Sequence, residues 1–189
     1  MVWLKRQGHS MPLKSTSSRY GTVAIGLHWV TAILIVALLA LGLNAADAET
    51  DALRRTLLIP HIGLGLLVFA LTLFRIGWWV LADKKPAPLA SVPALQNHLA
   101  TAVHVLSYAA ILALAASGIA TNVMAGVIDA LSTGAPIPAM DGVPPRAAHG
   151  LLARLFMVLL VLHIGAALYH QFFLRDSLLA RMGIGKLKD

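Results

Sequence analysis

Two histidines, His149 and His163, lie fourteen residues apart in an apolar segment that begins near Ala147. Fourteen steps of about 100° return a helix to nearly the same face, so both imidazoles point to one side, roughly 21 Å apart along the axis. A histidine inside a bilayer is costly unless its ring nitrogens are satisfied. The spacing therefore predicts two metal centres, one near each membrane surface.

The composition indicates an integral membrane protein. Of the 189 residues, 58% are hydrophobic and 12% are charged, and the mean hydropathy is +0.78, a value that no ordinary soluble domain approaches. Long runs of Ala, Leu and Val favour helices over a transmembrane barrel. The net charge of +7 is scattered along the loops, so no nucleic-acid partner is expected. Without cysteine, any haem must be bound noncovalently.

The apolar runs predict one all-α membrane domain over residues 1–189. Four transmembrane spans are expected, at about residues 22–44, 57–81, 98–124 and 147–174. The amino-terminus, the second link and the tail together hold eleven Lys and Arg residues when Arg75 is included, against three in the other two loops. By the positive-inside rule, both termini are expected to be cytoplasmic.

Two further histidines, in the first and second predicted spans, fall at depths that match His149 and His163. His28 lies near the cytoplasmic end of the first span, and His61 lies near the periplasmic end of the second. Depth therefore pairs His28 with His163 and His61 with His149, and each pair can supply two axial ligands to one iron. A single intramembrane histidine could equally bond to a carbonyl or a serine, but four at matched depths favour metal ligation. The expected fold is a four-helix transmembrane bundle that encloses two noncovalent, bis-histidine b haems.

Two arginines fall inside the predicted spans. Arg75 lies fourteen residues after His61, on the same helix face and at the depth of the cytoplasmic pair. Because a buried guanidinium needs an anion, a haem propionate is its expected partner, with snorkelling to lipid phosphate as the alternative. For Arg154, propionate contact and snorkelling stay equally open. A porphyrin could lie against helix backbone at the glycines that flank the histidines, which are Gly63, Gly65, Gly150 and Gly165.

Four motifs carry a resemblance to a known family. They are Gly26-Leu-His-Trp, Pro60-His-Ile-Gly-Leu-Gly with Arg75, His104-Val-Leu-Ser-Tyr108, and the stretch from His149 through His163 to His170. Over nearly its whole length the sequence resembles the bacterial diheme cytochrome b561 family, in particular the small four-helix members typified by superoxide oxidase. The resemblance carries the axial ligands over onto His28, His61, His149 and His163.

The resemblance also implies a bacterial inner-membrane protein that carries electrons from superoxide, in the periplasm, to ubiquinone. His170, seven residues beyond His163, is expected either to meet a quinone carbonyl or to be an interfacial histidine. His104 is expected to support a haem propionate or the quinone, or else to pack the third helix. Arg54 and Arg55 are expected to draw superoxide towards the periplasmic haem, or else to cap the second span.

A second function is compatible with the same residues. The chain could be a membrane anchor whose haems serve a redox partner protein, such as a hydrogenase, a formate dehydrogenase or a periplasmic c-type cytochrome. The chain length favours a stand-alone oxidoreductase, because such anchors usually carry longer docking extensions. A histidine-lined metal transporter is not expected, because the predicted spans contain no carboxylate.

Overall fold

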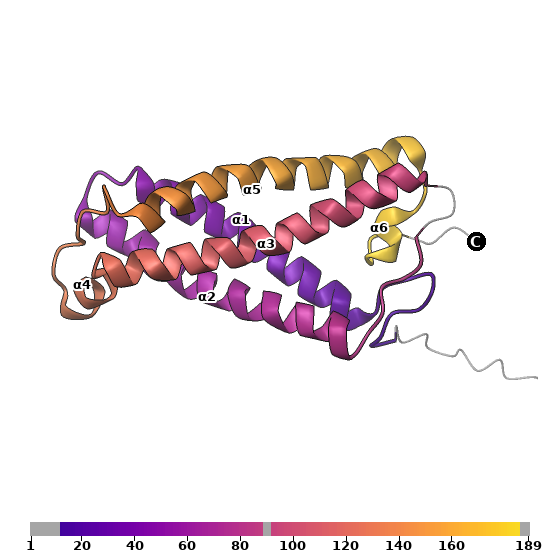
Figure 1. Cartoon of the computed structure of the whole chain (residues 1–189), viewed down its shortest axis with the longest axis horizontal. Coiled ribbons are helices and arrows are strands. Elements are labelled where there is room, and N and C mark those ends of the chain that lie inside the picture. The colour runs from indigo at the N-terminus through magenta and orange to yellow at the C-terminus, as the bar shows by residue number, and fades with distance from the viewer. Residues whose placement is uncertain (1–11, 89–91, 186–189) are drawn as a thin grey trace, which may run out of the picture.

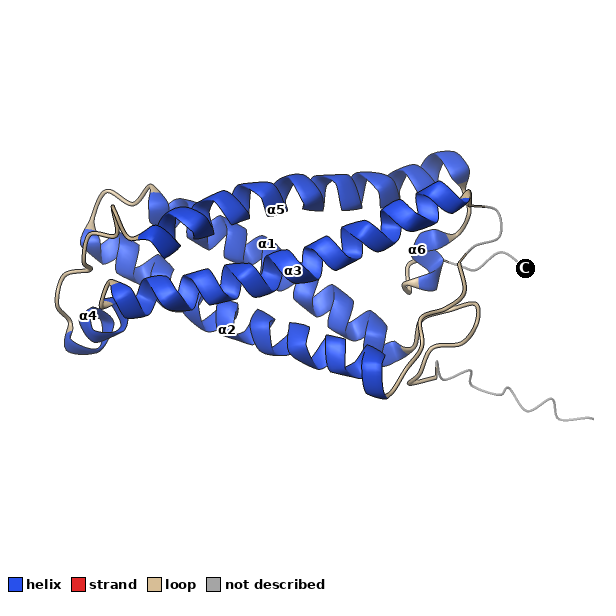
Figure 2. Ribbon diagram, viewed as in Figure 1, coloured by secondary structure: helices blue, strands red, loops and turns tan. Residues whose placement is uncertain are grey.

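The computed structural model describes residues 12–88 and 92–185, and every regular element within them is a helix (Figures 1 and 2). Four spans are long and apolar enough to cross a membrane: α1 (Thr22–Ala46), α2 (Asp51–Leu81), α3 (Ala94–Met124), and α5 (Pro144–Tyr169) continued by the π-helical turn η1 (His170–Leu174). The short helices α4 (Val127–Thr133) and α6 (Leu178–Arg181) lie at opposite ends of the bundle (Figure 1). The expected all-α bundle of four membrane-spanning helices is confirmed.

The helices α2 and α3 begin at Asp51 and Ala94, several residues before the predicted spans, which begin at about residues 57 and 98. Residues outside the apolar runs start both helices. The side chain of Thr50 accepts a hydrogen bond from the Leu53 amide at 3.2 Å, and Asp51 adds a negative charge to the first turn of α2. Both features stabilise a helix amino-terminus. The helix α3 begins directly after Pro93. These starts extend both helices beyond the membrane-crossing segments themselves.

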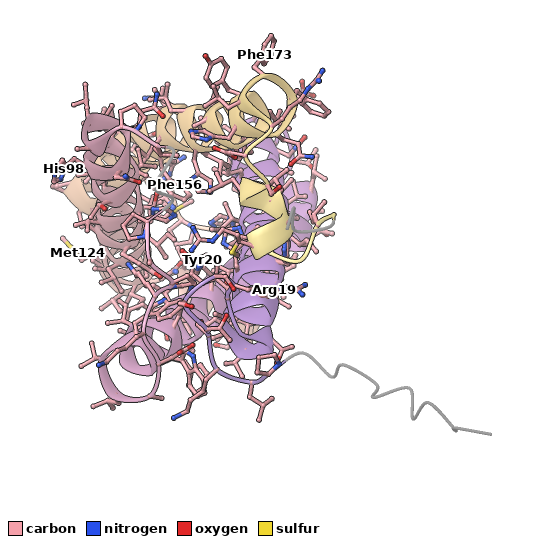
Figure 3. The ribbon with its side chains drawn as sticks, turned by 90° about the vertical axis from the view of Figure 1, so that its right-hand side faces the viewer. Arg19, Tyr20, His98, Met124, Phe156 and Phe173 are labelled. Carbon is pink, nitrogen blue, oxygen red and sulfur yellow. The ribbon has the colours of Figure 1, made fainter. Side chains whose placement is uncertain are left out.

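An apolar layer fills the bundle halfway along its length. Ile35, Val68 and Phe156 are buried there in contact with one another and with neighbouring leucines. Phe156 points into the interior of the bundle (Figure 3). It lies seven residues from both His149 and His163, so the layer separates two levels of histidines.

The outer faces of the long helices are apolar. Val36, Phe74, Leu106 and Val161, one from each of the four spans, are exposed by 55% or more. Single exposed apolar residues are normal in soluble proteins, but exposed apolar side chains along every long helix match the hydrocarbon of a bilayer. The chain is therefore a multi-pass membrane protein.

Three segments distant in sequence form a cap over one end of the bundle, onto which Figure 3 looks. This terminal cap consists of residues 12–21, 82–88 and 175–185. The guanidinium of Arg181 donates hydrogen bonds to the carbonyls of Ser18 at 3.0 Å and Ala87 at 2.7 Å, and its own carbonyl accepts one from the Tyr20 amide at 3.3 Å. One buried arginine thus joins all three segments.

Asp83 is a second anchor of the terminal cap. Its carboxylate accepts hydrogen bonds from the Ser15 amide at 3.0 and 3.1 Å and from the Ser15 hydroxyl at 2.8 Å. Trp78 Nε1 and the Lys84 amide donate to it as well, at 3.2 and 2.8 Å. Burial raises the pKa of Asp83, but these hydrogen bonds outweigh the burial and hold the pKa below its usual value.

Candidate cofactor-binding site

The structure brings together the histidine pairs expected from the sequence. The ring centroids of His28 on α1 and His163 on α5 are 6.1 Å apart. Those of His61 on α2 and His149 on α5 are 6.2 Å apart. The two pairs lie on either side of the apolar layer, at two depths of the bundle.

Each long helix contributes one residue to each level, and on every helix these two residues are fourteen positions apart. Because fourteen residues make nearly four turns, one helix face supplies both. The terminal level, nearer the terminal cap, consists of His28, Arg75, His104 and His163. The loop level, nearer α4, consists of Gly42, His61, Gly118 and His149. Sequence reasoning found this interval on two helices and missed it on α1 and α3, where a glycine occupies one of the two positions.

At the loop level, backbone carbonyls orient both imidazoles. Nδ1 of His61 donates to the Leu38 carbonyl at 3.1 Å. Nδ1 of His149 donates to the Leu114 carbonyl at 3.0 Å and also lies 3.1 Å from the Ser117 hydroxyl. A histidine whose Nδ1–H donates in this way keeps the lone pair of Nε2 available for a metal.

Two glycines on neighbouring helices make room for these imidazoles. A Cβ atom at Gly42 would lie 2.8 Å from Cε1 of His61, and one at Gly118 would lie 3.3 Å from Cε1 of His149. Any other residue would press on the ring. Of the flanking glycines expected to face a porphyrin, Gly65 and Gly150 line the cavity described below, and a Cβ at Gly63 or Gly165 would meet nothing within 4 Å. A Cβ at Gly65 would lie 4.0 Å from the Leu38 side chain, and one at Gly150 would lie 3.2 Å from the Arg146 guanidinium.

A cavity of about 600 Å³ opens beside His61 and His149. Its lining is mostly aliphatic and includes Gly42, Gly118 and the buried face of Phe156. Large apolar cavities with a few polar groups suit planar ligands of cofactor size. The cavity is also lined by three guanidinium-bearing residues that could bind carboxylates, namely Arg54, Arg146 and Arg154. Arg146, three residues before His149, was not singled out from the sequence.

The neighbouring residues Arg54 and Arg55 have different surroundings. Arg54 lines the cavity, and its Nη2 donates to the Ala48 carbonyl at 3.1 Å. The guanidinium of Arg55 instead donates to three backbone carbonyls at the end of α4 and beyond it, those of Ala130, Leu131 and Ala135. Arg55 thus caps the carboxyl end of α4, whereas Arg54 is the one placed to meet an anion in the cavity.

At the terminal level, His104 adds a third imidazole. Its ring centroid lies 5.3 Å from that of His163, and its Nδ1 donates to the Ala100 carbonyl at 2.6 Å. Two imidazoles that bind the same iron from opposite sides, each through a nitrogen at about 2 Å, have ring centres roughly 6 Å apart. The spacing of His28 and His163 fits this arrangement, whereas His104 lies too close to His163 for it.

Arg75 also belongs to the terminal level. Its Nε is buried and has no hydrogen-bond partner among the described residues, and its guanidinium carbon lies 5.7 Å from the centre of the Tyr108 ring. A buried cation with an unmet donor fits an anionic group that the protein chain does not itself provide. A haem carboxylate at this level would meet that need.

The set of side chains suits iron held in a macrocycle better than a bare ion. Within residues 12–88 and 92–185, no group of three or more His, Asp or Glu side chains is arranged to hold a metal ion. Pairs of facing imidazoles instead suit a metal whose other ligands come from a porphyrin. The arrangement of paired histidines, cavity, arginines and glycines is compatible with haem.

Comparison with known proteins agrees with this chemistry. The family described as prokaryotic cytochrome b561 matches residues 19–185. The chain is also 29% identical over 184 residues to "Cytochrome b561 homolog 2" of Escherichia coli (strain K12), across 93% of this chain and 96% of that protein. The chain belongs to the prokaryotic cytochrome b561 family, and it is therefore a b-type haem electron-transfer protein of the bacterial inner membrane.

Proposed function

We propose that the protein binds two b haems and carries electrons from periplasmic superoxide to ubiquinone. The observation that supports two haems is the pair of ring-centroid distances, 6.1 Å for His28 with His163 and 6.2 Å for His61 with His149. Both are near the roughly 6 Å that two axial imidazoles require. When bound, each haem iron would take up and release one electron at a time.

The charges at the two ends of the bundle support the proposed orientation. The terminal cap carries six described basic residues, Lys14, Arg19, Lys84, Lys85, Arg175 and Arg181. The opposite end has only three arginines, and five acidic residues outnumber them: Asp47, Glu49, Asp51, Asp129 and Asp141. By the positive-inside rule the terminal cap faces the cytoplasm, and the loop-level histidines face the periplasm.

The loop level provides a route for a small anion. His61 and His149 would together hold the haem at this level, so a donor would pass its electron to the haem without binding to the iron. Although this end of the bundle is acidic as a whole, three arginines and one carboxylate line the cavity itself: Arg54, Arg146, Arg154 and Asp141. The net positive charge of the cavity raises the local concentration of an anion such as superoxide, an effect that salt screens. This supports a stand-alone oxidoreductase.

The acceptor end lies at the terminal level. His170 follows His163 by seven residues, so it lies roughly 10 Å further along the helix towards the cytoplasm. There a quinone dissolved in the inner leaflet can approach the imidazole from the lipid. We assign ubiquinone reduction to this end.

Rapid mixing tests the proposal. When superoxide is mixed with the purified holoprotein, it should reduce the haems without any partner protein. A water-soluble ubiquinone added afterwards should reoxidise them. The same experiment with superoxide dismutase present is the control and should show no reduction. If only a dehydrogenase, a hydrogenase or a c-type cytochrome reduces the haems, the membrane-anchor function replaces this proposal.

A further inference from the structure

His170 and Asp176 form a partly buried acid–base pair at the cytoplasmic end of α5. Nδ1 of His170 lies 2.5 Å from Oδ2 of Asp176, and the two side chains are only 14% and 9% exposed. The second carboxylate oxygen of Asp176 accepts a hydrogen bond from the Leu178 amide at 3.1 Å. The carboxylate is therefore fixed by the backbone that follows it, and it holds the imidazole in one orientation.

The local backbone is unusual, and the pair depends on it. Residues six apart on a regular α-helix point to different faces, so an unbroken α5 would keep Asp176 away from His170. Here the helix ends in the π-helical turn η1, and both Arg175 and Ser177 adopt left-handed conformations, with φ of 53° and 63°. Positive φ is uncommon for such residues, and π-helical turns and strained backbone gather at functional sites.

An aromatic surface lies next to the pair. Tyr169, Phe172 and Phe173 are exposed by 50%, 64% and 77%, and Phe173 projects away from the bundle (Figure 3). The Tyr169 ring stacks on Phe173 with centroids 5.4 Å apart and meets the edge of His170 at 6.3 Å. A quinone ring arriving from the lipid can pack against such aromatic faces before it reaches the imidazole.

We infer that the His170–Asp176 pair is the proton donor for quinone reduction, an assignment that rests on the proposed function. Ubiquinone needs two electrons and two protons to become ubiquinol, and two superoxide anions supply the electrons and leave as dioxygen. For each proton, the N–H bond at Nε2 of protonated His170 breaks, the electron pair stays on nitrogen, and an O–H bond forms on a quinone oxygen. Water from the cytoplasmic side then restores the proton to Nε2.

Asp176 acts in this step as a positioning residue. Its carboxylate accepts the hydrogen bond from Nδ1–H of His170, which directs Nε2 away from the carboxylate and fixes the orientation of the ring. Asp176 does not touch the quinone. It acts on the quinone only through His170.

The test separates the two half-reactions. Holoprotein reduced chemically with dithionite is mixed with a water-soluble ubiquinone, and haem reoxidation is followed in H₂O and D₂O. General acid catalysis typically contributes 10²- to 10⁴-fold, so reoxidation of His170→Ala should be about a hundredfold slower, with millimolar imidazole restoring part of the rate. The matched control is His98→Ala, an exposed histidine on the same end of the bundle, and it should reoxidise at the wild-type rate (Figure 3).

Asp176 variants test the positioning role. Asp176→Asn should slow reoxidation about tenfold, and Asp176→Glu should recover most of that loss, because the carboxylate is retained. A wild-type rate in His170→Ala, or a slow rate that imidazole does not restore, would overturn the inference. Because dithionite supplies the electrons, these results do not depend on superoxide. A wild-type protein that ubiquinone cannot reoxidise would instead refute the acceptor half of the proposed function, and the inference with it.

Discussion

Gly42 on α1 lies directly against the imidazole of His61 on α2, so that a Cβ atom at Gly42 would be 2.8 Å from Cε1 of the ring. No side chain fits in that gap without moving the ring. The position of a proposed iron ligand is thus set partly by a residue that has no side chain. Gly118 and His149 repeat the relationship on α3 and α5, at 3.3 Å.

Replacement of Gly42 should therefore affect haem binding more than folding. In Gly42→Ala the methyl group would displace His61 from the Leu38 carbonyl, and the protein should lose most of one haem. The free energy of unfolding of the apoprotein should change by less than about 1 kcal/mol, since alanine suits a helix better than glycine does. Pyridine haemochrome analysis and thermal unfolding measure the two effects. Gly63→Ala, on the helix that bears His61, is the control and should keep both haems, because Gly63 is exposed, does not line the cavity, and has open space around its Cβ position.

The histidine pairs predict separate losses of the two haems. Wild-type protein should contain two haem equivalents per chain, both low-spin. His149→Ala should lack mainly the loop-level haem, and His163→Ala mainly the terminal-level haem, because each variant leaves the other pair intact. Haemochrome content and electron paramagnetic resonance of the oxidised protein measure this. One equivalent in the wild type, or a high-spin signal, would contradict the pairing.

Much of this arrangement could be predicted from the sequence. Hydropathy located the four spans, because a bilayer demands long apolar helices. The interval between His149 and His163 indicated two levels, and the alternation of helix direction matched them to His28 and His61. Family membership follows from the same residues and is confirmed by the match over residues 19–185.

Other parts of the site could not be predicted in this way. The role of Gly42 depends on how closely α1 approaches α2, which no property of α1 alone reveals. The contact of Asp176 with His170 depends on left-handed backbone at Arg175 and Ser177, and neither residue type signals that conformation. Arg54 and Arg55 are identical in type and adjacent in sequence, so only the position of the loop after α4 distinguishes them.

The different surroundings of these two arginines predict different phenotypes. Arg54→Gln should slow haem reduction by superoxide about threefold or more at low ionic strength, because it removes a positive charge from the cavity. The difference from wild type should shrink as added salt screens the charge. Stopped-flow measurements of the haem reduction rate of both proteins, from about 10 mM to about 500 mM salt, test this prediction.

Arg55→Ala should mainly lower stability. It leaves three backbone carbonyls near α4 without their donor, which should cost about 1–3 kcal/mol in the free energy of unfolding. The superoxide rate per folded molecule should stay close to wild type. An Arg55 variant with wild-type stability and a lost salt dependence would reverse the two roles.

The stabilising contribution of Asp83 in the terminal cap is expected to be lost in acid. Its pKa in the folded protein lies below the ordinary value of 3.8, so its contribution to stability is present above pH 3.8 and is lost as the pH falls through the folded pKa. Asp83→Asn should have a lower melting temperature than wild type near neutral pH, and the gap should close as the solution is acidified below pH 3.8. Asp129→Asn, an exposed carboxylate at the other end, should show no such gap. A gap for Asp83→Asn that stays constant with pH would exclude this role.

The positive charge of Arg75 is expected to raise the reduction potential of the terminal-level haem. Its buried Nε has no partner in the described chain, and the proposal pairs it with a carboxylate of the terminal-level haem. Adding an electron to a nearby iron is easier beside a positive charge, so Arg75→Gln should lower the midpoint potential of that haem by several tens of millivolts and leave the other unchanged. Arg75→Lys should retain most of the potential, because the charge remains although the bidentate fork is lost. A redox titration monitored by optical spectroscopy resolves the two haems, with Arg154→Gln, which lines the cavity at the other level, as the matched control. If neither potential moves in Arg75→Gln, the guanidinium pairs with lipid phosphate and not with haem.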